Sequence, residues 1–253
     1  MPENAAPSTT SWPRLSGLGL SGMLVTFGDT LTEPANRAAL ACRAGLEAEG
    51  WDGVEETSAS LTSVYLRFDP LHLSHAALTA RLTAYLAGRD WYAAPLPGGR
   101  RLWRIPTVYG GEAGPQLADA AALAGMTPDA AIADLSAAQV RVLTIGFAPG
   151  QPYLGSLPPA WDLPRQTALT AQVPEGALVV AVRQFVLFAS PSPTGWRTVG
   201  RTAFRSFRPD SDAPFPLRPG DEVTFSAVTP EEMARIRAED RNGDGGASMR
   251  ALA

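Results

Sequence analysis

The spacing of apolar residues predicts a small α+β unit in the first hundred residues. Met23, Val25 and Phe27 alternate with their neighbours as in a strand, and later segments repeat this period of two or the spacing of a helix. The predicted elements run strand, helix, strand, strand, helix, strand, at residues 23–27, 32–50, 53–59, 64–68, 74–88 and 102–105. This order is that of the ferredoxin-like split arrangement.

The second half of the chain has a different pattern, in which short apolar segments are separated by glycine and proline. A turn at residues 109–115 precedes an alanine-rich helix that ends at Gly125, and Thr127 begins a second short helix. Strands are predicted at residues 140–147, 177–188, 196–207 and 222–227. Short strands at this density, with glycine and proline at their ends, predict a closed or nearly closed β-barrel.

These patterns divide the chain into four parts and predict an α+β fold class. Residues 1–15 are expected to form a disordered tail, residues 16–100 the small α+β domain and residues 101–229 the barrel domain. Residues 230–253 are rich in charged and small residues, so most of them are expected to be disordered. Their D-R-N-G-D-G run at 240–245 matches only the first half of a calcium-binding loop, which favours a disordered tail over a calcium site.

Composition and charge exclude several classes of protein. The 253 residues carry 21 Lys and Arg against 25 Asp and Glu, so the net charge of −4 offers no basic face for nucleic acid. No apolar run approaches the ~20 residues that cross a bilayer, and residues 1–12 lack the features of a secretion signal. No membrane association is therefore expected, and the expected location is the cytoplasm. The lone Cys42 excludes an internal disulfide and is predicted to be a buried, inert thiol.

The two histidines of the chain, His72 and His75, both precede the barrel domain. A Ser-His-Asp triad or a histidine-ligated metal confined to that domain is therefore impossible. We expect no metal site, and no residue is assigned a catalytic role. Any contribution to hydrolysis must come from Arg, Tyr, Gln, backbone amides and carboxylates, or from a site completed by another protein chain.

Two segments of the barrel domain predict a shaped ligand pocket. Residues 145–155 (I-G-F-A-P-G-Q-P-Y-L-G) and 195–202 (G-W-R-T-V-G-R-T) combine Gly, Pro, aromatic and Arg residues without a nucleophile–base pair. Pro149, Gly150 and Tyr153 are expected to shape the mouth of the pocket, with Tyr153 facing a ligand. The alternative is a barrel-closing turn with a tyrosine in the core.

Four further side chains are candidate ligand contacts. Trp196 and Arg201 lie five residues apart and should face opposite sides of a strand unless a bulge at Gly200 re-aims one of them. Arg201 can hold a carboxylate or phosphate, or else it is a surface arginine paired with an acidic neighbour. Gln184 either points into the pocket toward a ligand amide or turns outward at a hairpin tip. Arg165 is the fourth candidate.

Five separated segments resemble one known family. They are residues 105–115 (I-P-T-V-Y-G-G-E-A-G-P), 146–155, 174–176 (P-E-G), 192–202 (S-P-T-G-W-R-T-V-G-R-T) and 217–225 (L-R-P-G-D-E-V-T-F). In this order they resemble the family that includes the B-type subunits of prokaryotic ATP-dependent 5-oxoprolinases, Kip-type inhibitors of a sporulation histidine kinase, and the so-called allophanate hydrolase subunit 1. The resemblance covers residues 16–229 and implies a small α+β domain followed by a cyclophilin-like barrel.

The resemblance also implies a function. By this resemblance, the chain is expected to be one subunit of a complex that opens 5-oxoproline (pyroglutamate) to glutamate and hydrolyses ATP in doing so. Because the chain has no P-loop motif, the implied partners are a companion carboxyltransferase-like, C-type subunit and a lactam-utilisation-type, A-type subunit. One alternative is a non-catalytic regulator that binds a sensor histidine kinase. Another is a member of a urea or allophanate carboxyltransferase, which ranks last because the chain has no biotin-carrier M-K-M motif.

The chain departs from the family pattern at positions around the expected pocket. Six residues differ from those that relatives usually carry at the same positions. They are Leu135, Gln151, Val179, Val182, Val186 and Thr194, and relatives tend to have glycine at the three valine positions. A β-branched side chain in place of glycine disfavours positive φ and fills space beside the chain. We therefore expect a narrower pocket or a different ligand.

Overall fold

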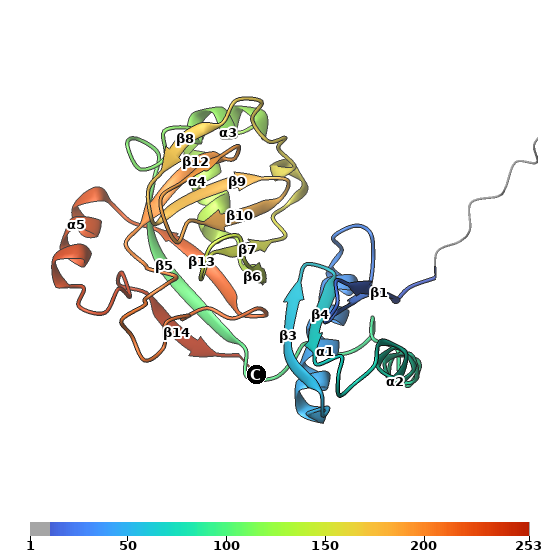
Figure 1. Ribbon diagram of the computed structural model, residues 1–253. Coiled ribbons are helices and arrows are strands. Elements are labelled where there is room, and N and C mark those ends of the chain that lie inside the picture. Colours follow the sequence, from blue (N-terminus) through green and yellow to red (C-terminus); the bar gives the residue numbers. More distant parts are fainter. Residues whose placement is uncertain (1–10, 253) are drawn as a thin grey trace, which may run out of the picture. The chain divides into compact units, whose positions relative to one another are not determined.

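The computed structural model describes residues 11–252, which divide into two compact units (Figure 1). The division falls between Pro97 and Gly98, close to the boundary expected from the sequence. Within the described residues no helix is long and apolar enough to cross a membrane.

The first unit is an antiparallel sheet packed against two helices. Its strands follow the order β1-β2-β4-β3, and its elements are β1 (Arg14–Leu18), β2 (Gly22–Thr26), α1 (Glu33–Glu49), β3 (Val54–Ser60), β4 (Ser63–Phe68) and α2 (His75–Ala87). Thr32 and Ser74 cap the two helices through their side-chain oxygens. Apolar residues of both helices and of β2 and β4 share one buried core.

The prediction that residues 102–105 complete this small sheet was wrong. Those residues belong to β5 (Arg101–Tyr109) in the second unit, and β1 occupies the sheet edge beside β2 instead. The disordered tail expected over residues 1–15 was wrong for Arg14 and Leu15, which lie in β1, whereas residues 1–10 lie outside the described residues. Four of the five β1 residues are exposed, so this edge strand shows no apolar alternation in the sequence.

The second unit contains a closed barrel of seven strands. The order around the barrel is β6-β13-β5-β12-β9-β10-β7, and β7 pairs with β6 to close it. Besides β5, these strands are β6 (Val140–Ile145), β7 (Pro152–Gly155), β9 (Ala177–Ala181), β10 (Gln184–Leu187), β12 (Arg197–Thr202) and β13 (Glu222–Ala227). The α+β class with a barrel domain is thereby confirmed.

Two apolar clusters lie on opposite faces of the barrel wall. All seven strands contribute to the larger cluster, which is therefore the barrel interior, and α3 (Leu117–Leu123) and α4 (Pro128–Ala137) pack against it. The smaller cluster uses the alternate residues of β9 and β10, so it covers their outer face. A two-stranded sheet of β8 (Thr170–Val173) and β11 (Ser192–Thr194) adds Val173 to this outer cluster.

The prediction of disorder over residues 230–253 was wrong for most of that segment. It forms α5 (Pro230–Glu239) and β14 (Ser248–Ala251), and β14 pairs antiparallel with β5 (Figure 1). Thr229 and Glu232 form a capping box at the start of α5. Only Met233 of α5 is buried and every side chain of β14 is exposed, so neither element has the apolar pattern that would reveal it.

Candidate functional site

A tight turn joins β9 to β10 and fixes the position of Gln184. Val182 and Arg183 both have positive φ, as in the two-residue turns preferred by β-hairpins. The backbone N–H of Arg183 donates to the carbonyl of Trp161 at 2.9 Å, and its Nε donates to the carbonyl of Leu157 at 2.9 Å. Arg183 therefore occupies the hairpin tip, while Gln184 begins β10.

Tyr153, Gln184 and Trp196 are brought to one outer face of the barrel. Tyr153 is opposite Val186 on β10, so Gln184, two residues from Val186, projects from the same face. The rings of Tyr153 and Trp196 lie 6.2 Å apart and nearly perpendicular. The guanidinium of Arg165 lies 5.6 Å from the centre of the Trp196 ring. We call the group of Tyr153, Trp196 and Arg165 the arginine-aromatic patch.

The floor of the arginine-aromatic patch is filled. Val179 and Val186 are opposite each other on β9 and β10, and both are buried in one cluster with Trp196 and Tyr153. Their methyl groups occupy space that glycine would leave open. The patch is accordingly a packed apolar surface with an aromatic and cationic rim.

Arg201 shares this outer face but lies at the other end of β12. As the sequence allowed, the pairing of β12 with β9 shifts register between Thr198 and Gly200, and the bulge places Arg201 opposite Ala177 of the outer cluster. Its Nε donates to the carbonyl oxygen of Glu175 at 3.2 Å. Arg201 therefore lies beside Glu175 and α5 and is separate from the Tyr153 and Trp196 rings.

The Pro149–Gly150 loop packs against a different segment. Gly150 is buried with φ +72°, and a Cβ there would lie 2.4 Å from the carbonyl oxygen of Ser206. Pro149 is exposed. The loop is closed by the N–H of Gly146, which donates to the carbonyl of Gln151 at 3.0 Å. Gly150 is therefore needed for close packing against residue 206, which favours a structural role for the Pro149–Gly150 loop over ligand contact.

A cavity of about 570 Å³ contains Arg201 and is a candidate ligand site. Its walls come from the Tyr109–Ala113 segment of the chain, from Arg201, and from Met233 and Arg237 of α5. The hydroxyl of Tyr109 donates to the carbonyl of Phe225 at 2.9 Å, and burial raises the pKa of Tyr109 above its ordinary value. Tyr109 thus closes the wall of the cavity and is not free to act as an acid or base.

The contribution of α5 to this cavity was missed by the sequence reasoning. Arg237 and Met233 lie in a segment that was expected to be disordered. The T-P-E-E run at residues 229–232 is a capping-box signal, and it could have identified the helix.

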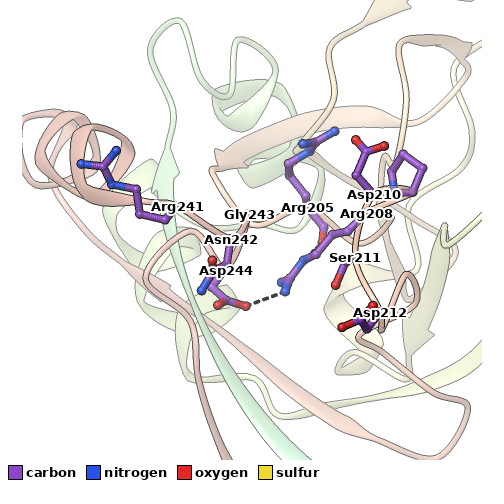
Figure 2. Close-up of a pocket in the computed structure, with 10 residues that line it drawn as sticks. Arg205, Arg208, Asp210, Ser211, Asp212, Arg241, Asn242, Gly243 and Asp244 are labelled. Atoms are coloured by element: carbon purple, nitrogen blue, oxygen red, sulfur yellow. Dashed lines mark hydrogen bonds and ion pairs between the residues drawn. The ribbon is translucent and has the colours of Figure 1, made fainter.

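A second cavity, of about 590 Å³, is lined by charges of both signs (Figure 2). Arg208 points at Asp244, and their side chains form an ion pair of 2.6 Å. Arg205 also has a carboxylate partner, Glu175, at 3.1 Å. The described residues contain no group of three or more His, Cys, Asp or Glu that could hold a metal ion. Because two of its arginines are already paired, this cavity is the weaker candidate.

The chain is a barrel protein with a small α+β unit before it, and its candidate sites present arginine and aromatic side chains. More specifically, the chain belongs to the family of the carboxyltransferase domain, subdomain C and D, whose sequence profile matches residues 13–217.

The chain is also similar to two curated proteins in sequence and to a solved structure in fold. The B-type subunit of 5-oxoprolinase from Bacillus subtilis (strain 168) is 28% identical over 233 residues, which cover 89% of this chain and 97% of that protein. The corresponding B-type protein of Escherichia coli O157:H7 is 39% identical over 125 residues, 49% of this chain and 57% of that protein. The crystal structure of Kluyveromyces lactis urea carboxylase has the same fold, with a TM-score of 0.69 at 20% identity over 92% of this chain and 23% of that one.

Proposed function

We propose that this chain is the B-type subunit of an ATP-dependent 5-oxoprolinase complex, which opens 5-oxoproline to glutamate only when its partner proteins are present. The observation that carries the proposal is the match to the Bacillus subtilis protein, which extends over 97% of that relative. The cytoplasmic location expected from the sequence stays a prediction.

The chemistry of the reaction fits the groups that this chain supplies. The lactam amide is stabilised by resonance, and transfer of a phosphoryl group from ATP to its oxygen would lower the barrier to attack by water. Such a reaction needs cationic groups for the substrate carboxylate and the phosphoryl charge, and Arg201 supplies one inside a cavity. In this proposal Gln184 recognises the lactam amide, while Tyr153, Trp196 and Arg165 form a surface for the ring or for a partner.

The proposal places ATP in the assembled complex. The sequence contains no P-loop motif, so a conventional phosphate-binding loop must come from elsewhere. The proposed partners are a carboxyltransferase-like, C-type subunit and a lactam-utilisation-type, A-type subunit.

Reconstitution tests the proposal directly. The measurement is 5-oxoproline-dependent ATP hydrolysis by the chain alone, by its candidate partners alone, and by the full mixture. We expect activity only in the full mixture. Trp196→Ala should reduce turnover in that mixture, with Trp12→Ala, in the other unit, as the matched control. A full mixture without activity would refute the proposed function.

A second function is favoured by one observation, the filled floor of the arginine-aromatic patch. Val179 and Val186 leave a surface better suited to a protein partner than to a small molecule. The alternative is therefore a non-catalytic regulator that binds a sensor histidine kinase. Recovery of such a kinase by the chain, together with no heat of binding for 5-oxoproline, would favour the regulator over the enzyme component.

A further inference from the structure

We propose that the cavity between the Tyr109–Ala113 segment and α5 is an anion site, in which Arg201 and Arg237 together bind the carboxylate or phosphoryl group of a small molecule. The inference deepens the proposed function and rests on it for the choice of 5-oxoproline as one probe. It adds α5, which lies outside the matched residues 13–217, to the binding machinery.

The two guanidinium groups come from distant parts of the sequence and line the same cavity. Arg201 extends from β12 and is half-buried, while Arg237 extends from the last turns of α5 and is exposed. Burial lowers the pKa of Arg201 first, and the positive charge of Arg237 lowers it further, whereas Glu175 opposes both. Two like charges that line one cavity repel each other, and a bound anion would relieve the repulsion.

Two carboxylates that line a neighbouring cavity with this pair are engaged elsewhere. Arg201 and Arg237 also line a neighbouring cavity of about 180 Å³ with Glu175 and Asp240. The Glu175 carboxylate accepts a hydrogen bond from Arg205 at 3.1 Å, and it is the Glu175 backbone carbonyl that contacts Arg201. The Asp240 carboxylate accepts hydrogen bonds from three backbone N–H groups of its own loop. Among the described residues, neither Arg201 nor Arg237 has a carboxylate within ion-pair distance.

The remaining walls suit a small organic anion. A volume of about 570 Å³ lies within the range of small-molecule sites. Met233 and Tyr109 supply apolar surface, and Gly110 and Gly111 keep the wall free of side chains. Glu112 is the one acidic residue in the lining, and it is exposed. Its charge should weaken anion binding, which makes it useful as a probe.

The test is calorimetric titration of the full chain at low ionic strength with inorganic phosphate and, separately, with 5-oxoproline. Arg237→Met should weaken binding of the anion by about tenfold or more, as expected for loss of a charge-assisted hydrogen bond. Arg235→Met is the matched control, because Arg235 is exposed on the same helix and outside the cavity lining. Glu112→Gln should tighten binding, and Arg201→Lys should weaken it while keeping the charge.

The outcomes separate this inference from the proposed function. Binding of phosphate alone would assign the site to a phosphoryl group, and binding of 5-oxoproline alone would assign it to a carboxylate. If neither anion binds, or if Arg235→Met weakens binding as much as Arg237→Met, the inference is overturned. Anion binding that persists in a chain inactive in the reconstituted mixture would leave the site standing and remove the 5-oxoprolinase role. Thermal melting of each variant verifies folding.

Discussion

The buried carboxylate of Asp221 binds the side chain and the backbone of Arg101. Asp221 Oδ1 accepts from the Arg101 backbone N–H at 3.1 Å and from its Nε at 3.2 Å, while Oδ2 accepts from the backbone N–H of Arg218 at 3.0 Å. Arg101 also donates to the carbonyl of Pro216 at 2.8 Å. The R-P-G-D run at residues 218–221 therefore ties the turn before β13 to the start of β5, its parallel neighbour in the barrel.

Removing the charge of Asp221 should destabilise the barrel strongly. Asp221→Asn keeps the shape of the side chain but leaves the Arg101 guanidinium without its counter-charge in a site where Asp221 is only 2% exposed. We expect a loss of about 3 kcal/mol in the free energy of unfolding, measured with urea. Asp212→Asn, at an exposed position, should change it by less than ~0.5 kcal/mol. Equal stability of the two variants would contradict this role of Asp221.

Gly150 and Gly125 provide a matched pair for testing close packing. Both have φ of +72°, but a Cβ at Gly150 would meet the Ser206 carbonyl oxygen at 2.4 Å, whereas a Cβ at Gly125 meets nothing within 4 Å. Gly125→Ala should cost about 1 kcal/mol, the penalty for a left-handed backbone alone. Gly150→Ala should cost at least about 2 kcal/mol more, because the backbone must also shift. Thermal melting of both variants distinguishes steric packing from backbone conformation.

The barrel could be predicted because its strands are covered on both faces or show clear alternation. The prediction of one strand over residues 177–188 was wrong in its detail, because Val182 and Arg183 turn the chain and divide the apolar stretch into β9 and β10. The bulge near Gly200 was only allowed as an exception by the sequence, and the structure has it. The edge strands β1 and β14 could not be predicted, since backbone pairing with a neighbour holds them and their side chains are largely exposed.

The candidate site could be predicted only in part, for a related reason. The sequence identified Tyr153 and Trp196 as candidates, and their rings lie 6.2 Å apart, although β7, which holds Tyr153, was not predicted and Trp196 directly precedes β12. Arg201 lines a cavity, and its role as a ligand contact stays a prediction. The position of Arg237 depends on where α5 packs, which no local pattern encodes. The sequence also suggested that Tyr153, Trp196 and Arg201 share one pocket. Val179 and Val186 instead pack with Tyr153 and Trp196 in an apolar cluster on the outer face of the barrel.

The thiol of Cys42 should be unreactive in the folded protein. Its side chain is fully buried in the core of the first unit, and burial raises its pKa to about 12 against a small opposing effect of Arg89. Because the thiolate is the reactive form, only about one thiol in ten thousand is ionised at pH 8. Ellman's reagent at pH 8 should therefore modify almost nothing until urea unfolds this unit, after which one equivalent reacts. Rapid reaction without urea would show that Cys42 is accessible in the native state.

The loop after α5 should keep its structure without calcium. Asp240 accepts the backbone N–H groups of Asn242 and Asp244 through Oδ1 and of Gly245 through Oδ2, and Arg208 pairs with Asp244. The guanidinium supplies the positive charge that a cation would supply in a calcium loop. Millimolar calcium should therefore leave the melting temperature unchanged. Asp240→Ala should instead accelerate hydrogen exchange of residues 242–245, because it removes all three acceptor contacts at once. A calcium-dependent rise in melting temperature would show that the ion pair with Arg208 yields to a metal.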